Sequence, residues 1–353
     1  MNAVIAGFAE RVRQAAAQKR PLRLKGGGSK DFYGGPLAGE ILDTRAYAGI
    51  VSYDPTELVV TARAGTPLRE LETLLAGQGQ MLAFEPPHFG DGATVGGVVA
   101  SGLSGPRRAT SGSVRDFVLG VKLMDGRGEV LNFGGQVMKN VAGYDVSRLI
   151  AGSLGTLGLI LEVSLKVLPR PAAELTLRLE TPQVNALEWM NSWAGQPLPI
   201  SATSWQDDLL TLRLSGARAA VAAAREHLGG ELVADGPNFW QELREQRTGF
   251  FKTGSTLWPL WRLSLPSVTP PLPGSQLIEW GGSLRWVKSG EAKLAAETVS
   301  AGGHAALFRG SEEARSAGVF QALPPTLMSL HRKLKHAFDP AGIFNPGRLA
   351  QGL

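Results

Sequence analysis

Two glycine-rich segments have the residue types and spacing to bind an anionic group through the main chain. The first, Lys25–Ser29 (KGGGS), directly follows the short apolar stretch Leu22–Leu24. The second runs from Gly92 to Pro106 with the sequence GATVGGVVASGLSGP. Consecutive glycines let backbone N–H groups converge without interference from Cβ atoms, which suits a pyrophosphate. The two segments together therefore predict a phosphate cradle made of backbone.

Several common nucleotide and catalytic motifs are absent from the sequence. The first segment is not G-x-G-x-x-G because Asp31 occupies the position of the third glycine, and no Gly-Lys-Ser/Thr forms a Walker loop. The sequence contains neither a G-x-S-x-G elbow nor an H-E-x-x-H metal helix. With no cysteine in the chain, disulfides, thiolate catalysis and iron–sulfur ligation are excluded. We expect no metal site.

Short strands and helices must position the glycine-rich segments. Thr66 and Pro67 predict the start of a helix over Leu68–Leu75, with the threonine as its cap. In the first part of the chain, β-rich runs predict strands at Leu22–Leu24, Glu40–Leu42, Gly49–Tyr53, Leu58–Ala62, Val118–Met124 and Glu129–Phe133. Farther on we expect strands at 174–180, 209–214, 261–265, 283–287 and 304–308, and helices at 183–193, 217–228, 291–301 and 325–338.

A chain of 353 residues is longer than one ordinary hydrophobic core, so two domains are expected. All eight tryptophans lie between Trp189 and Trp286, and all four tyrosines lie at or before Tyr144. This shift in composition predicts a boundary at Leu168–Pro171, where prolines end a strand. Most tryptophans are expected in the core, and a docking surface for a partner protein is the alternative.

The composition is that of a globular protein, with 43% hydrophobic and 19% charged residues. The net charge of +5 comes without long basic runs, so an acidic partner or an anionic ligand is favoured over nucleic acid. The basic run His331–His336 is predicted to be a solvated helix face. Val4–Val12 predicts an amphipathic helix rather than a signal peptide, and the apolar stretch Leu149–Leu161 is too short to span a bilayer. We therefore expect a cytoplasmic protein without a transmembrane segment.

Three later segments extend the pattern of the two glycine-rich ones. They are Lys139–Asp145 (KNVAGYD), Gly152–Glu162 (GSLGTLGLILE) and Phe338–Arg348 (FDPAGIFNPGR). In order and spacing, the five segments resemble the vanillyl-alcohol-oxidase/PCMH family of FAD-binding proteins, in its glycolate and D-lactate dehydrogenase branch. The likeness covers most of residues 20–170 and 304–350.

The resemblance implies an α+β, PCMH-type FAD-binding fold of two subdomains, with a ferredoxin-like α+β cap. The FAD-binding domain is expected at residues 1–170 and the cap, which also docks a partner, at 171–303. Residues 304–353 are expected to return to the FAD-binding domain.

The resemblance also implies a set of residues that hold FAD noncovalently. Lys25–Ser29 is expected around the pyrophosphate, and the second segment around the pyrophosphate and the edge of the flavin. The segment Gly152–Glu162 is expected around the adenosine half, and Asn345 near the isoalloxazine. Each assignment has an open alternative. Lys25–Ser29 could be an ordinary strand-to-helix turn, and the second segment could be a glycine patch for helix packing. The segment Gly152–Glu162 could be buried sheet core, and the stretch around Asn345 a plain turn. The implied residues are Lys25, Gly26, Gly27, Gly28, Ser29, Thr94, Gly96, Gly97, Ser101, Gly155, Leu159, Ile160 and Asn345.

The sequence departs from the catalytic pattern of this branch. Catalytic relatives carry a His-x-Gly-Asp-Gly-Asn-x-His segment, whereas here Gly302–Arg309 stands at the comparable place and keeps only His304. Oxidation of a hydroxy acid by a flavin needs a base for the alcohol proton. We therefore favour a flavoprotein subunit of a glycolate-oxidising complex, which acts on glycolate and by extension on D-lactate.

In that interpretation the main catalytic site lies on a paralogous FAD-binding subunit, and an iron–sulfur subunit takes the electrons. Contact with the inner membrane through these partners stays open. One alternative is a self-sufficient FAD-dependent 2-hydroxy-acid dehydrogenase that uses His304 as its base. The other is a structural subunit that has lost its flavin.

Overall fold

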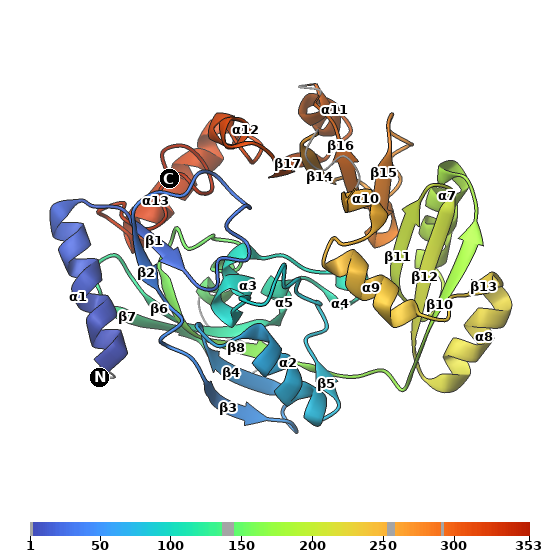
Figure 1. The fold of residues 1–353 in the computed structure, drawn as a ribbon, viewed down its shortest axis with the longest axis horizontal. Coiled ribbons are helices and arrows are strands. Elements are labelled where there is room, and N and C mark those ends of the chain that lie inside the picture. The colour runs from blue at the N-terminus through green and yellow to red at the C-terminus, as the bar shows by residue number, and fades with distance from the viewer. Residues whose placement is uncertain (1–2, 136–144, 253–257, 291–292) are drawn as a thin grey trace.

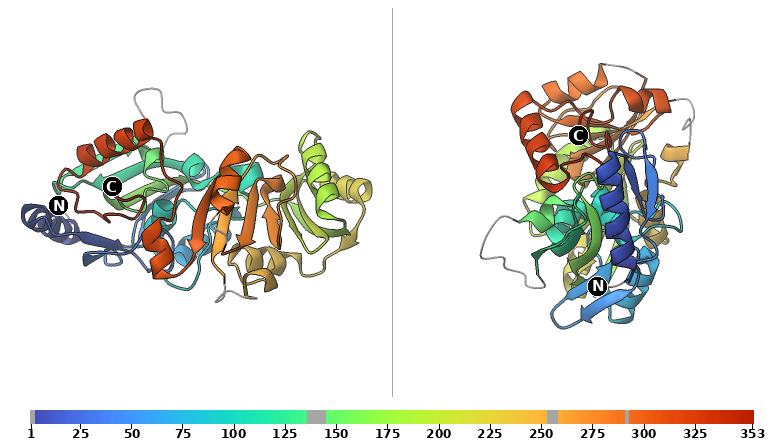
Figure 2. Two further views of the ribbon diagram at one scale, coloured as in Figure 1. Left: turned by 90° about the horizontal axis from the view of Figure 1, so that it is seen from above. Right: turned by 90° about the vertical axis from the view of Figure 1, so that its left-hand side faces the viewer.

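The chain folds into two domains that lie end to end, as the computed structural model of residues 3–135, 145–252, 258–290 and 293–353 shows (Figure 1). The N-terminal domain occupies one end and the cap the other, and the C-terminal residues return beside the N-terminal domain (Figure 2). The segment 139–144, which carries part of the third motif, lies outside the described residues. No helix within the described ranges is long and apolar enough to cross a membrane.

A five-stranded antiparallel sheet in the order β3-β4-β8-β6-β7 is the centre of the N-terminal domain. Its middle strand β8 is buried except at Glu162 and Lys166, which are partly exposed, and its other residues are apolar apart from Ser164. Helices α2 and α3 pack on this sheet through a core that contains Leu71, Leu75, Val98 and Val163. The elements are β3 (Ile50–Asp54), β4 (Val59–Arg63), α2 (Leu68–Gly77), β5 (Gln80–Met81), α3 (Val95–Ser101), α4 (Arg108–Ser111), α5 (Val114–Phe117), β6 (Val118–Met124), β7 (Val130–Gly134), α6 (Val146–Leu149), β8 (Leu159–Lys166) and β9 (Leu168–Pro169).

The second subdomain joins the two ends of the chain. Strands β1 (Leu22–Lys25) and β2 (Glu40–Asp43) pair in parallel, and helix α1 (Ala3–Gln18) covers them with its apolar face. The C-terminal tail runs beside β1, because the Leu22 N–H donates to the Ile343 carbonyl and the Asn345 N–H donates to the Leu22 carbonyl. The tail thereby reaches the strand that leads into the first glycine-rich segment.

The cap is one eight-stranded antiparallel sheet in the order β13-β10-β12-β11-β15-β16-β14-β17. Its first four strands with α7 and α8 have the β-α-β-β-α-β connectivity and 4-1-3-2 order of a ferredoxin-like unit. Read from the opposite edge, the last four strands have the same order, although no helix lies between β14 and β15, and the two units join where β11 pairs with β15. The elements are β10 (Ala173–Glu180), α7 (Gln183–Ala194), β11 (Ile200–Gln206), β12 (Leu209–Gly216), α8 (Arg218–Leu228), β13 (Glu231–Leu232), α9 (Gly236–Arg244), α10 (Gly249–Lys252), β14 (Leu260–Ser264), β15 (Gln276–Glu279), η1 (Trp280–Gly282), β16 (Leu284–Lys288), α11 (Leu294–Ser300) and β17 (His304–Arg309).

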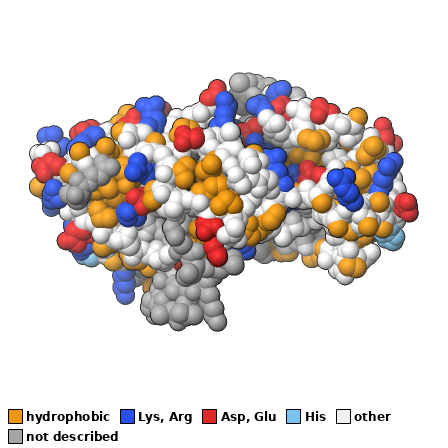
Figure 3. All heavy atoms as spheres, turned by 90° about the horizontal axis from the view of Figure 1, so that it is seen from below, with side chains coloured by type: hydrophobic (Ala, Val, Ile, Leu, Met, Phe, Trp, Pro, Cys, Tyr) orange, Lys and Arg blue, Asp and Glu red, His pale blue; other side chains and the backbone are white. Residues whose placement is uncertain are grey.

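The cap packs on the N-terminal domain through aromatic side chains. Leu103 and Tyr33 of the N-terminal domain share a buried cluster with Trp280, Trp286 and Phe308 of the cap. The Trp280 indole N–H donates to the Gly105 carbonyl at 3.0 Å, directly within the second glycine-rich segment. Four of the eight tryptophans are buried and Trp258 is exposed, so the core is the main site of these side chains. On the face shown in Figure 3, basic side chains are dispersed among acidic ones.

Several elements differ from the sequence-based expectation. Strand β17 was expected to begin the C-terminal segment, yet it pairs with β14 as the last strand of the cap sheet. The return to the N-terminal domain therefore starts after Arg309, with α12 (Glu312–Ala317) and α13 (Pro325–Phe338). Residues 95–101 of the second glycine-rich segment form helix α3, which was not among the helices expected from the sequence. The reason is that Thr94 caps this helix through its side chain.

Two side chains have other roles than expected. Thr66 does not cap α2: its hydroxyl exchanges hydrogen bonds with the backbone of Gly49, and Pro67 takes the cap position. Lys335, from the basic run predicted to be solvated, is buried. Its ammonium group donates to Asp339 and to the carbonyls of Thr156 and Phe344, which would otherwise be unpaired acceptors.

Candidate functional site

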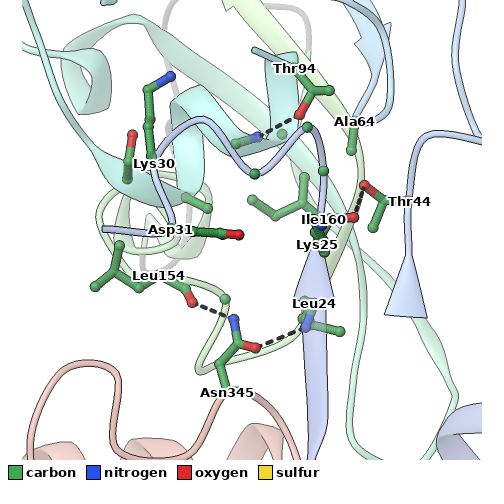
Figure 4. A pocket seen from close by; sticks show the side chains of 18 of the residues that line it. Leu24, Lys25, Lys30, Asp31, Thr44, Ala64, Thr94, Leu154, Ile160 and Asn345 are labelled. Atoms are coloured by element: carbon green, nitrogen blue, oxygen red, sulfur yellow. Dashed lines mark hydrogen bonds between the residues drawn. The ribbon is translucent and has the colours of Figure 1, made fainter. Parts of the chain in front are cut away.

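A cleft of about 780 Å³, including its open mouth, lies between the two subdomains of the N-terminal domain (Figure 4). Its walls come from the turn after β1, from α3, from the start of β8 and from the C-terminal tail. These segments are far apart in the sequence and meet only in the folded chain. The volume is in the range of pockets that enclose a cofactor-sized ligand.

The two glycine-rich segments are in direct main-chain contact at this cleft. A Cβ atom on Gly27 would lie 1.4 Å from the Gly92 carbonyl oxygen, and one on Gly26 would lie 2.4 Å from the Thr94 hydroxyl. Gly28 has a φ of +74°, which side-chain-bearing residues rarely adopt. These positions therefore require glycine, and the cleft floor next to them is backbone without side chains in front of it.

Helix α3 positions the small residues of the second segment. The Thr94 hydroxyl accepts the Gly97 N–H at 3.3 Å, which fixes the helix start at the cleft (Figure 4). A Cβ on Gly96 would lie 2.6 Å from the Cβ of Ala64, the residue directly after strand β4. Gly96 thus permits close helix-to-sheet packing, as the glycine-patch alternative required, while it also lines the cleft.

The opposite wall is held together by one side-chain amide from the tail. Asn345 accepts the Leu24 N–H at 2.8 Å and donates to the Leu154 carbonyl at 2.7 Å (Figure 4). Asn345 has a φ of +41°, and its amide nitrogen lies so near Gly155 that a Cβ there would approach it to 2.7 Å. Asn345 therefore fastens β1 to the segment before β8, in addition to lining the cleft.

Positive charge predominates along the cleft. Lys25, Lys30 and Arg348 line it, against one acidic residue, Asp31, which forms an ion pair with Arg23 at 2.5 Å. Burial lowers the pKa of Lys30 to about 8. Its ammonium group donates to the Ser29 hydroxyl and to a backbone carbonyl. A net positive, backbone-lined cleft is suited to the charge of a diphosphate group.

A pair of arginines from the C-terminal part fixes the loop that follows the first glycine-rich segment. Arg348 donates to the carbonyls of Asp31, Tyr33 and Gly35, and Arg315 donates to carbonyls of the same loop. Burial, together with the neighbouring Arg315, lowers the pKa of Arg348 to about 10. The tail and the loop therefore form one rigid wall.

The structure brings all thirteen residues implied as cofactor contacts to this one cleft. Sequence reasoning did not find several others that line it, namely Leu24, Asp31, Thr44, Ala64, Leu154 and Arg348. Arg348 belongs to the Asn-Pro-Gly-Arg stretch, so its place beside Asn345 was the available signal. Leu154 belongs to the Gly152–Glu162 segment, whereas Leu24, Asp31, Thr44 and Ala64 lie in or beside strands and turns that no motif marks.

The two histidines considered from the sequence, His304 and His88, lie outside the cleft. His304 is exposed at the start of β17 and does not line the cleft; burial and the charge of Arg262 lower its pKa. His88 contacts Glu72 through its Nε2 atom at 2.8 Å, and it too is outside the cleft. Within the part of the chain that the structure describes, the cleft lining includes no histidine, cysteine or tyrosine.

Comparison with known families identifies the domain that contains the cleft. Residues 5–134 match the family described as FAD binding domain, and residues 315–349 match the C-terminal domain of FAD linked oxidases. The first solved structure of similar fold, an alkyldihydroxyacetonephosphate synthase, has a TM-score of 0.64 and 17% identity over 96% of this chain and 73% of that one. The fold and the cleft therefore define an FAD-binding protein of the PCMH type.

Two relatives assign the chain to a smaller group within this family. Glycolate oxidase subunit GlcE of Escherichia coli (strain K12) is 52% identical over 344 residues, which cover 96% of this chain and 95% of that protein. Glycolate oxidase subunit GlcD of Bacillus subtilis (strain 168) is 33% identical over 129 residues, 36% of this chain and 27% of GlcD. The chain belongs to the GlcE family of FAD-binding oxidoreductase subunits.

Proposed function

We propose that this chain is the FAD-binding subunit of a multi-subunit glycolate oxidase or dehydrogenase, with the main catalytic site on a paralogous subunit. The observation that carries the proposal is the contact between Gly27 and Gly92, which brings two glycine-rich backbones to one cleft. The relation to GlcE, a subunit by its name, supports the assignment to a complex. The relation to GlcD supports a paralogous partner.

The residues of the cleft fit FAD. The backbone of Gly26–Ser29 and the small residues Thr94, Gly96 and Gly97 would hold the pyrophosphate, with Lys25 supplying positive charge. Gly155, Leu159 and Ile160 would form the apolar wall for the adenosine half, and Asn345 and Ser101 would lie toward the flavin. When bound, FAD supplies a hydride acceptor for the oxidation of an alcohol carbon.

The attachment of FAD is proposed to be noncovalent. Covalent attachment needs a nucleophilic side chain in contact with the ring, and the described cleft lining offers no histidine, cysteine or tyrosine. His88 is already engaged with Glu72. Backbone N–H groups and a positive cleft would retain the cofactor instead.

Catalysis on a partner is supported by what surrounds His304. The four residues that follow His304 include neither an acid nor a histidine, and all of them, Ala305, Ala306, Leu307 and Phe308, are buried in the cap. His304 itself is exposed and outside the FAD cleft. The alternative of a self-sufficient dehydrogenase that uses His304 therefore gains no support from the geometry.

We also propose an iron–sulfur subunit as the electron acceptor within the complex. The chain has no cysteine, so the thiolates that hold such a cluster must come from another subunit. A cytoplasmic location, with membrane contact only through partners, completes the proposal.

The test uses the purified chain alone and together with its partner subunits. The chain should be yellow, and acid precipitation should release its FAD into the supernatant. Under anaerobic conditions, glycolate should bleach the colour only after the partner subunits are added. Bleaching of the isolated chain would overturn the partner-based assignment, and a folded chain that takes up no FAD would overturn the proposal as a whole.

A further inference from the structure

Helix α13 is held to the N-terminal domain by residues near its C-terminal end. Its buried residues are Lys335 and Phe338, and the Phe338 ring packs against the Phe133 ring with 5.9 Å between the two centroids. From residue 325 to residue 333, by contrast, every residue is at least partly exposed. The helix lies on the outside of the domain (Figure 2). Most of its length is therefore open to contact by another molecule.

Three leucines recur along one side of this helix. Leu327, Leu330 and Leu334 are separated by three and then four residues, which places them in one row on an α-helix. Leu327 and Leu330 are 46% and 56% exposed, and Leu334 packs in part against the core of the N-terminal domain. Single exposed leucines are common on protein surfaces. A row with this spacing is instead the narrow seam that is typical of helix pairing.

The surface on both sides of the leucine row lacks negative charge. In a heptad with the leucines at positions a and d, the flanking positions e and g are His331 and Lys333. No acidic residue occurs from residue 314 to residue 338. Among the residues that the structure describes, Arg332 and Lys333 take part in no ion pair. Their charges are therefore available to an acidic partner.

This pattern favours an acidic helix over two other occupants. A second copy of the chain would bring the same basic residues to both sides of the contact, where like charges repel. A helix that lies in a lipid interface has a wide apolar face, commonly with tryptophan or phenylalanine. Residues 325–333 contain neither, and their exposed leucines form only a narrow row.

We propose that α13 docks an amphipathic helix of a partner subunit, which presents an apolar row flanked by acidic side chains. That such a subunit exists rests on the proposed function, whereas the place and the chemistry of the contact rest on α13. The tail that follows this helix carries Asn345 and Arg348, which line the cofactor cleft. The partner is thereby joined to one wall of that cleft, and the cap is not the docking element.

The affinity of the FAD-loaded chain for its purified partner subunits, measured by calorimetry, tests the proposal. Leu330→Glu should weaken binding at least about a hundredfold, because it places a charge in an apolar contact and repels acidic side chains. Lys333→Glu should weaken it about tenfold, and added salt should weaken the wild type more than Lys333→Gln. Leu232→Glu is the matched control, since Leu232 is 48% exposed on β13 at the far end of the cap (Figure 1).

Urea unfolding and FAD content should be the same in Leu330→Glu and the wild type, because Leu330 is exposed. Equal partner affinity in these two proteins, or loss of binding in Leu232→Glu alone, would overturn the proposed surface and leave the complex intact. A wild-type chain that binds no partner subunit would refute the proposed function itself.

The two other occupants have tests of their own. The isolated wild-type chain should remain monomeric in sedimentation, and it should not float with phosphatidylglycerol vesicles. A dimer that Leu330→Glu dissociates would assign the row to a second copy, and flotation that Leu330→Glu abolishes would assign it to lipid. Either result would overturn the proposal.

Discussion

Replacement of Glu279 by glutamine should make the protein more stable at alkaline pH than the wild type. Glu279 is buried among apolar side chains and tryptophans, and burial raises its pKa from 4.5 to about 7. Trp286 and Arg262 favour the charged form, and Glu85 opposes it. Glutamine keeps an acceptor for the Trp286 N–H and never ionises. The variant therefore removes the titration while it preserves the contact.

The direction and size of the effect follow from proton linkage. A folded-state pKa above the unfolded value stabilises the fold below about pH 4.5, and this stabilisation is lost as the pH rises through about 7. The pKa of Glu279 differs by roughly 2.5 units between the folded and unfolded chains. At about 1.4 kcal/mol per unit, this difference amounts to about 3 kcal/mol of folding free energy when the pH rises from below the lower pKa to above the higher one. Between about pH 5 and pH 8, the free energy of unfolding of Glu279→Gln should therefore gain about 2 to 3 kcal/mol on that of the wild type.

Parallel urea unfolding of the two proteins, followed by tryptophan fluorescence, measures this difference. Titration of all other groups is common to both proteins and cancels when the two free energies are subtracted. A difference that stays constant from acidic to alkaline pH would refute the reasoning, because Glu279 would then titrate alike in the folded and unfolded chains.

Other predictions concern the cleft and the tail. Gly27→Ala should weaken FAD binding at least about tenfold in a fluorescence titration, because its Cβ collides with backbone. The control is Gly7→Ala in α1, where a Cβ would meet open space. It should bind FAD normally, and its free energy of unfolding in urea should rise by about 0.5–1 kcal/mol. Lys335→Met should lower the free energy of unfolding in urea by about 3–5 kcal/mol, because buried Asp339 loses its counter-ion. A variant as stable as the wild type would contradict this. Asn345→Ala should lower the free energy of unfolding by about 2 kcal/mol or more, since the Leu24 N–H and the Leu154 carbonyl lose their partner. An unchanged free energy of unfolding would show that water replaces the amide.

The cleft was more predictable from the sequence than the fold around it. Main-chain binding of a diphosphate requires glycine at particular positions, and the requirement is visible as Gly26–Gly28 and Gly96–Gly97. The contact of Gly27 with Gly92 explains why both segments need it. Ala64 was missed because it lies in a turn that carries no motif, and Arg348 was missed although it belongs to the same motif as Asn345.

The sequence-based predictions of element boundaries were wrong where contacts with residues distant in the sequence determine the structure. β17 was assigned to the returning segment, but its pairing with β14 makes it the fourth strand of the second ferredoxin-like unit. The glycines of α3 argue against a helix by propensity, yet the Thr94 cap and the close approach of Gly96 to Ala64 favour one. Lys335 looked solvated within a basic run, although three acceptors from separate segments surround its ammonium group.

The separation between cofactor binding and catalysis has a physical basis in this chain. The proposed FAD contacts are backbone groups and small residues of the N-terminal domain and the C-terminal tail, so we expect substitutions in the cap to leave FAD binding intact. The cap can therefore lose an acid and a histidine around His304 without loss of the cofactor site. Its interface with the N-terminal domain still contains Arg262, whose charge favours the ionised form of the buried Glu279. Burial of the Glu279 carboxylate costs more free energy than the nearby arginine charge returns, which is why the pKa of Glu279 stays raised.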